Sequence, residues 1–193
     1  MVWNRFNNAW QEDNKQQHPV MGHFLNPELD KQVGCGYIGV ANMLAYFGVT
    51  YKELADMFEL LLISEKPLPY PDEIDNKAYK IAYYWYQGFQ EISKIAKERG
   101  YRRVFTVEPT ASVSYRYKDL RGYTTTPEVS PPVCHPVTKQ SRRVSETSTE
   151  VYQYPPDVEV AGTDVGWETH FSLNNSIQRI MNQTGLALSL IHI

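Results

Sequence analysis

The longest periodic stretch of the chain, residues 72–99, limits the available folds more than any other feature. Its apolar residues recur at steps of three and four, which is the spacing of one face of an α-helix: Ile74, Ala78, Ile81, Ala82, Trp85, Phe89, Ile92 and Ala96. Gly100 follows at a helix C-terminus, and the β-branched and aromatic run Val104–Val107 predicts a strand. A helix that leads through a short turn into a strand predicts an α/β fold, helix-rich with few strands.

The segment after this strand has the residues of an anion-binding turn. They are a proline that ends ladder pairing and four small or hydroxyl-bearing residues: Pro109, Thr110, Ala111, Ser112 and Ser114. Backbone N–H groups and hydroxyls that follow a strand suit an oxyanion or a phosphate. From these residues alone, however, we favour a capped turn with no ligand, because such turns are common after strands.

Three further helices are predicted from the same periodicity. Residues 28–47 form the first, and residues 50–63 form the second, which begins with a capping box between Thr50 and Glu53. The third runs from Gly166 to Gln183 and ends at Gly185. Its apolar side is expected to contain Phe171, Leu173, Ile177, Ile180 and Met181.

Three glycines in the first predicted helix, Gly34, Gly36 and Gly39, match the GxGxxG spacing of a phosphate-binding loop. We favour close backbone packing instead, because no hydrophobic strand is expected before them. The polar residues 138–150 predict a solvated loop. Contact between phosphate and its basic cluster, Lys139, Arg142 and Arg143, is the alternative.

Composition excludes several classes of protein. The 193 residues are 42% hydrophobic and 21% charged, which is the composition of a folded domain. A net charge of −3 predicts no nucleic-acid partner, and the absence of a long apolar run predicts no membrane span. The two cysteines, Cys35 and Cys134, lie too far apart in sequence to predict a disulfide framework or a metal site, so we expect a reducing, cytoplasmic location.

Four strings of the chain, taken together, resemble the catalytic subunit of ribonucleotide reductase. They are residues 33–44 (VGCGYIGVANML), 108–117 (EPTASVSYRY), 121–132 (RGYTTTPEVSPP) and 165–169 (VGWET). The similarity is closest to the adenosylcobalamin-dependent (class II) enzymes of cyanobacteria and their phages, with class I as the alternative. The strings follow the family's order and cover most of residues 28–186.

The resemblance implies a fold and a substrate. Residues 1–186 would form the later part of the family's ten-stranded α/β barrel. Residues 187–193 look like a non-native tail, since they resemble translated sequencing-adapter sequence. The phosphate of a ribonucleoside di- or triphosphate would bind at the turn formed by Pro109, Thr110, Ala111 and Ser112, with Ser114 as a further contact. Adenosylcobalamin and a thioredoxin-like reductant would serve the whole enzyme.

The resemblance also implies that the chain is a fragment with no catalytic residue of its own. The family's chemistry needs a radical cysteine in an Asn-x-Cys-x-Glu loop and two redox cysteines, and none of these motifs is present. Such a fragment would be inactive alone, and its strands would have open edges.

Two other functions remain open from the sequence. The chain could be a stand-alone, non-catalytic nucleotide- or phosphate-binding module. It could also be a helical interaction protein that uses the face from Ile74 to Ala96. Exposure of that face would favour the interaction protein, whereas its burial against a sheet would count against it.

Overall fold

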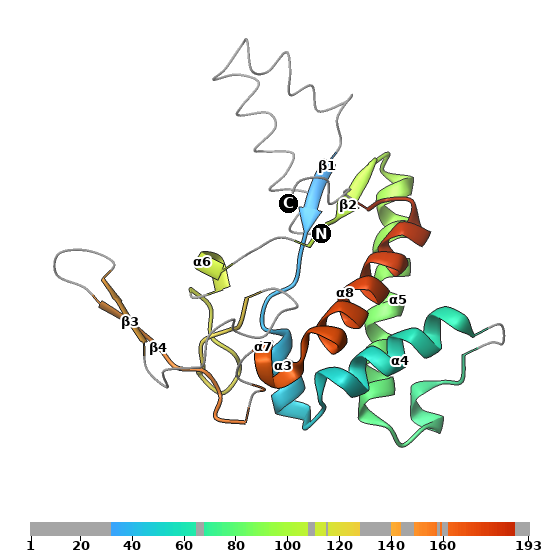
Figure 1. Cartoon of the computed structure of the whole chain (residues 1–193). Helices are drawn as coiled ribbons and strands as arrows, with labels where there is room; N and C mark the ends of the chain where they lie inside the picture. The colour runs from blue at the N-terminus through green and yellow to red at the C-terminus, as the bar shows by residue number, and fades with distance from the viewer. Residues whose placement is uncertain are drawn as a thin grey trace, which may run out of the picture.

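The structure, a computed structural model, describes residues 32–64, 68–107, 111–114, 116–127, 140–143, 149–157, 159 and 162–187 (Figure 1). The elements in chain order are β1 (Gln32–Cys35), α3 (Val40–Phe47), α4 (Tyr51–Ile63), the 3₁₀ turn η1 (Pro71–Glu73), α5 (Lys77–Glu98), β2 (Arg103–Phe105), α6 (Ala111–Ser114), β3 (Gln140–Arg143), β4 (Thr149–Tyr152), α7 (Gly162–Val165) and α8 (Trp167–Thr184). No helix within these ranges is both long and apolar enough to cross a membrane.

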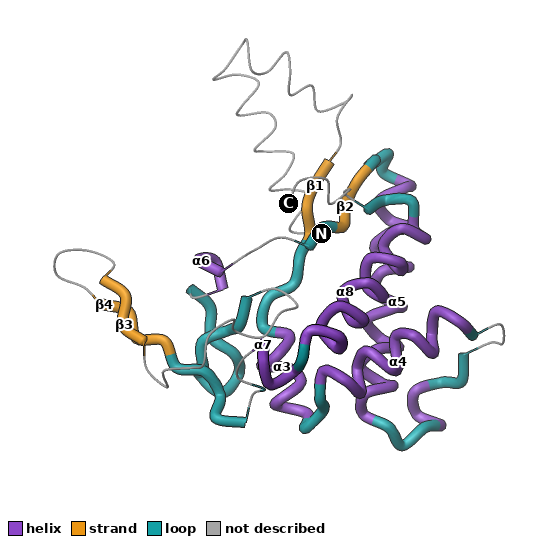
Figure 2. Tube along the Cα trace, in the orientation of Figure 1, coloured by secondary structure: helices purple, strands orange, loops and turns teal. Residues whose placement is uncertain are grey.

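The strands β1 and β2 pair in parallel, and the chain between them consists mainly of α3, α4 and α5. A second crossing through α8 brings Ala187 beside Phe105 in a further parallel bridge. Helices α5 and α8 lie on the same side of the strand pair (Figure 2). Parallel pairing through helical crossovers confirms the predicted α/β class, helix-rich with few strands.

The core lies where α4, α5 and α8 pack together and against β2. Phe58, Phe89 and Phe105 are fully buried, and the Phe89 ring on α5 meets the Phe105 ring on β2 at 4.9 Å between centroids. Helices α4 and α8 are also joined at their surface, where Ser176 Oγ donates to Glu59 Oε1 at 2.6 Å. On the predicted face of α5, Ala78, Ala82, Phe89 and Ala96 are buried, and the contact of Phe89 with β2 counts against the interaction protein. Ile92 was also expected on this face but is 41% exposed.

Local signals in the sequence locate the ends of the helices well. The Thr50 hydroxyl accepts from the Glu53 N–H, and the Glu53 carboxylate accepts from the Thr50 N–H, so the predicted capping box is confirmed. Gly185 ends α8 in the left-handed conformation, with φ of 72°. Such a φ favours glycine because it has no Cβ.

The predicted helix over residues 28–47 is wrong from Gln32 to Gly39, and residues 28–31 lie outside the described residues. Gln32–Cys35 is a strand, and the helix starts only at Val40. Glycine is a poor helix former, and here the backbone of this segment gains hydrogen bonds by pairing with β2, about seventy residues away. A strand that was not expected is therefore present, and it includes the first of the three glycines, Gly34.

Two other expectations are wrong. The polar stretch around residues 138–150 was expected to be a loop, but it includes β3, which pairs antiparallel with β4 as a hairpin. Phe171 was placed on the apolar side of the last helix, yet its side chain is 67% exposed. The remaining predicted apolar residues of α8, including Leu173 and Ile177, are buried as expected.

Candidate functional site

The candidate site lies at the edge of the sheet where the parallel strands end. Strand β1 ends at Cys35 and leads through Gly36–Gly39 into α3, while β2 ends at Phe105 and leads toward α6. Parallel strands end at the same edge, so both connections lie there. In open α/β sheets ligands bind outside the carboxyl ends of the strands.

The predicted phosphate-binding turn follows β2. Pro109 and Thr110 lie outside the described residues, while Ala111 and Ser112 begin the single helical turn α6. Ser114, the last residue of that turn, is fully buried. Its carbonyl accepts a 2.6 Å hydrogen bond from Thr125 Oγ1. The hydrogen bond between Thr125 and the Ser114 carbonyl therefore fixes the end of the predicted turn.

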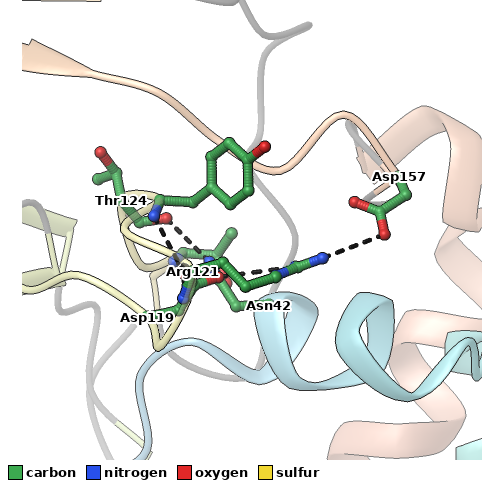
Figure 3. Close-up of polar contacts among 7 residues, drawn as sticks. Asn42, Asp119, Arg121, Thr124 and Asp157 are labelled. Atoms are coloured by element: carbon green, nitrogen blue, oxygen red, sulfur yellow. Dashed lines mark hydrogen bonds and ion pairs between the residues drawn. The ribbon is translucent and has the colours of Figure 1, made fainter.

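Asn42 on the first turn of α3 links this helix to the segment that follows α6. Its side-chain amide is buried, and Nδ2 donates to Thr124 O and to Asp119 Oδ2, both at 3.0 Å. Its Oδ1 accepts from the Thr126 N–H at 2.8 Å. One side chain therefore satisfies three partners that lie 77 to 84 residues further along the chain (Figure 3).

The segment Thr124–Thr126 is in turn hydrogen-bonded to the end of the predicted phosphate-binding turn. Thr125 bonds the Ser114 carbonyl through its hydroxyl and the Tyr117 carbonyl through its N–H. Gly39 fits against the same segment: its N–H donates to Thr126 O at 2.8 Å, and a Cβ at this position would stand 3.4 Å from Thr125 Cβ. A Cβ at that distance would make an ordinary contact, so the left-handed φ of 76° at Gly39 favours glycine here, rather than the close backbone packing expected from the sequence.

Asp119 shapes the tight turn that precedes this segment. Its Oδ1 accepts from the N–H groups of Arg121 and Tyr123, at 2.9 and 3.0 Å. Burial opposes the charged form of Asp119. The hydrogen bonds from Asn42, Tyr123 and Arg121, together with the Arg121 charge, outweigh burial and hold the pKa of the carboxyl below its ordinary value. Asp119 is therefore a charged acceptor at neutral pH.

Arg121 ties this turn to a third segment. Its guanidinium pairs with Asp157 at 3.2 Å and with Asp119 at 3.6 Å. It also lies over the Tyr123 ring, 5.3 Å from the centroid. Figure 3 shows Arg121 reaching from the turn toward Asp157. Beside this network is a cavity of about 340 Å³ lined by Asn42, Asp119, Arg121 and Thr125.

The structure shows no activated nucleophile among the residues it describes. Cys35 at the end of β1 is half-buried, and burial raises the pKa of its thiol, so the thiol stays protonated at neutral pH. Cys134 lies outside the described residues. Burial lowers the pKa of His170, whose ring contacts the Asn174 side chain on the same helix. Within the described ranges, no group of three or more His, Cys, Asp or Glu side chains could hold a metal ion.

Sequence reasoning missed Asn42, Asp119 and Thr125 as parts of this site. The strings that carry the resemblance could have pointed to these three residues, because each residue lies in or beside one of the strings. Comparison with known protein families and with curated proteins finds no match to this chain.

Proposed function

We propose that this chain is part of the catalytic subunit of a ribonucleotide reductase. In this proposal the subunit converts ribonucleotides to deoxyribonucleotides for DNA synthesis by thiyl-radical chemistry. The phosphate of the substrate is held at Pro109, Thr110, Ala111 and Ser112. The substrate is a ribonucleoside di- or triphosphate, and the class II type is favoured.

One observation carries the proposal. Three of the four strings that resemble the family are distant in sequence but meet at one place in the fold. Asn42 of residues 33–44 bonds Thr124 and Thr126 of residues 121–132. Thr125 of the same string bonds Ser114 of residues 108–117. A chance similarity of separate strings would not require them to be in contact.

The position of the turn in the sheet supports the same function. It follows β2 at the carboxyl edge of parallel strands, where α/β barrels and open sheets bind their ligands. Under this proposal the two parallel strands belong to the later part of the ten-stranded barrel, over residues 1–186. Ala187, the first residue of the expected non-native tail 187–193, pairs with Phe105, and residues 188–193 lie outside the described residues.

The proposal gives the chain binding and positioning roles rather than the radical step. The described cysteine, Cys35, is protonated and half-buried, and no Asn-x-Cys-x-Glu loop occurs in the sequence. We therefore expect the chain to be inactive alone. The radical-site and redox cysteines, like the thioredoxin-like reductant, would be supplied with the rest of the enzyme.

The residues described here do not fit adenosylcobalamin. Among the described residues, the cavity beside Asn42 is lined by no histidine or cysteine that could approach the cobalt. If the class II assignment is right, the cofactor binds to other parts of the enzyme.

The flanking genomic DNA tests whether the chain is a fragment. We expect the reading frame upstream of Met1 to encode the radical-site cysteine within an Asn-x-Cys-x-Glu loop. We expect the frame past Leu186 to continue in the family's pattern rather than as residues 187–193. A complete gene that starts at Met1 and stops after Ile193 would contradict the proposal.

A stand-alone, non-catalytic nucleotide-binding module is the second candidate, favoured by the well-formed core of Phe58, Phe89 and Phe105. It shares the phosphate-binding turn but needs no further chain. This candidate requires a cooperative unfolding transition for the chain by itself, so calorimetry that shows none would eliminate it.

A further inference from the structure

A second cavity, of about 750 Å³, lies between α3 and the first turns of α5. Its lining includes Tyr37, Met43, Phe47, Ile81, Tyr84 and Trp85. No residue of the phosphate-binding turn is among the described residues that line it. Its volume falls within the roughly 300–1,000 Å³ that is typical of small-molecule sites.

The wall of this cavity is almost entirely apolar and aromatic. Trp85 packs edge-on against Tyr37 at 4.9 Å and against Phe58 at 5.4 Å between ring centroids. Phe47 is 42% exposed and Tyr84 60% exposed, so both rings are accessible to an entering ligand. The wall offers only a few polar groups, so a nucleobase would bury several polar edge atoms without partners, which is costly. The wall therefore favours a hydrocarbon or a plain aromatic ring.

The charge at the cavity has one sign. Its charged lining residues are Lys77 and Lys80, both at the start of α5, and the first turn of that helix contains no acidic residue. Lysines at a helix N-terminus oppose the helix dipole, so their own helix gives no reason for this placement. The two ammonium groups and the N-terminus of α5 together give this part of the cavity a positive potential.

The two lysines differ in their bonding. Lys77 Nζ donates to the carbonyl of Phe47 at 3.1 Å, and this hydrogen bond joins the end of α3 to the start of α5. The side-chain ammonium of Lys80 makes no hydrogen bond or ion pair with any described residue, although the residue is half-buried at the cavity. A half-buried cation beside an apolar cavity is well placed to bind an anion that brings its own hydrophobic body.

We propose that this cavity binds a small hydrophobic monoanion. The apolar body packs against Met43, Ile81 and Trp85, and its carboxylate, or an equivalent singly charged group, binds to Lys80 with Lys77 nearby. The body is an alkyl chain or an unsubstituted aryl ring. The site is separate from the phosphate-binding turn, and this inference does not rest on the proposed reductase function.

Calorimetric titration of the full chain with a graded ligand series tests this chemistry. Among hexanoate, octanoate and decanoate, we expect affinity to rise about fourfold for each added methylene, since each is worth roughly 0.8 kcal/mol when buried. Octanol should bind about tenfold more weakly than octanoate. If naphthoate binds as tightly as octanoate, the natural ligand has an aryl body. If naphthoate binds more weakly, the natural ligand has an alkyl body.

Matched variants locate the binding. Lys80→Gln should weaken octanoate about tenfold, whereas Lys94→Gln, on the same helix outside the cavity, should change it less than twofold. Tyr84→Asp should also weaken octanoate binding about tenfold, because the new carboxylate at this exposed position would repel the carboxylate of the ligand. The control is Tyr70→Asp, 70% exposed and outside the cavity lining.

Several results would overturn the proposal. These are no saturable binding, equal affinity for octanol and octanoate, or equal effects of Lys80→Gln and Lys94→Gln. Competition by ADP would overturn it as well, because it would make the cavity a nucleotide site. A chain without a cooperative melting transition would do the same, because the cavity needs α3 and α5 packed together. Loss of ADP binding in a chain that still binds octanoate would contradict only the proposed function.

Discussion

Asn42 is the residue on which the geometry of the candidate site depends most. It is 3% exposed, and its amide bonds a carbonyl, a carboxylate and a backbone N–H from one distant segment. A buried amide with several of its bonds made in one place specifies a single arrangement of the chain around it. Asn42 therefore acts as a positioning residue for the proposed phosphate-binding turn, through Thr124–Thr126.

Replacement of Asn42 by alanine should destabilise the chain by about 3 kcal/mol. The change leaves the Thr126 N–H and the Thr124 carbonyl buried without their partners, and each such group costs roughly 1–3 kcal/mol. Urea unfolding measures the loss. Asn174→Ala removes an amide whose partner groups are all on His170 and should cost less than about 1 kcal/mol. Equal losses in the two variants would contradict the role of Asn42.

Asp119 predicts a pH dependence with a definite sign. Its pKa in the folded chain lies below its ordinary value, so its contribution to stability is fully present above about pH 4, the unfolded pKa, and is lost as pH falls through the folded pKa. Asp119→Asn should therefore flatten the loss of stability between about pH 4 and pH 2. Urea midpoints measured across this range test the expectation. An unchanged acid limb in Asp119→Asn, relative to Asp56→Asn on the exposed face of α4, would contradict it.

At the scale of elements, local sequence signals predicted the ends of helices correctly where those ends are stabilised by contacts between residues close in sequence. The capping box of α4 and the glycine that ends α8 are contacts within a few residues, and both were read correctly. The strand β1 was missed because its stability comes from pairing with β2 after a long crossover. Gln140–Arg143 was missed for a related reason, since its polar composition indicated a loop and only its pairing with Thr149–Tyr152 defines it.

Two phenylalanines test the packing of the helices. Phe89 on α5 is fully buried against Phe105, so Phe89→Ala should cost about 3–5 kcal/mol. Phe171 on α8 had been expected in the apolar face but is 67% exposed, and Phe171→Ala should change stability by less than about 0.5 kcal/mol. Thermal unfolding of both variants measures the difference. A large loss in Phe171→Ala would show that its side chain is covered after all.

At the scale of the whole molecule, the α/β class followed from the order of helix, strand and turn. The meeting of the three strings did not follow from it, because local periodicity contains no information on contacts between residues about eighty positions apart. The resemblance had grouped the strings without placing them. Asn42, Gly39 and Thr125 show the physical link: one buried amide, one glycine N–H and one hydroxyl.

The central claim is that the turn after β2 holds the phosphate of a nucleotide, and binding of ADP and adenosine to the full chain tests it most directly. We expect ADP to bind and adenosine to bind at least tenfold more weakly, because a charge-assisted phosphate contact is worth about 1.5–3 kcal/mol. Ser112→Asp should weaken ADP at least tenfold by repulsion, whereas Val113→Asp, at a side chain that is 46% exposed, should weaken it less than threefold. Equal affinity for ADP and adenosine, or equal losses in the two variants, would contradict the account.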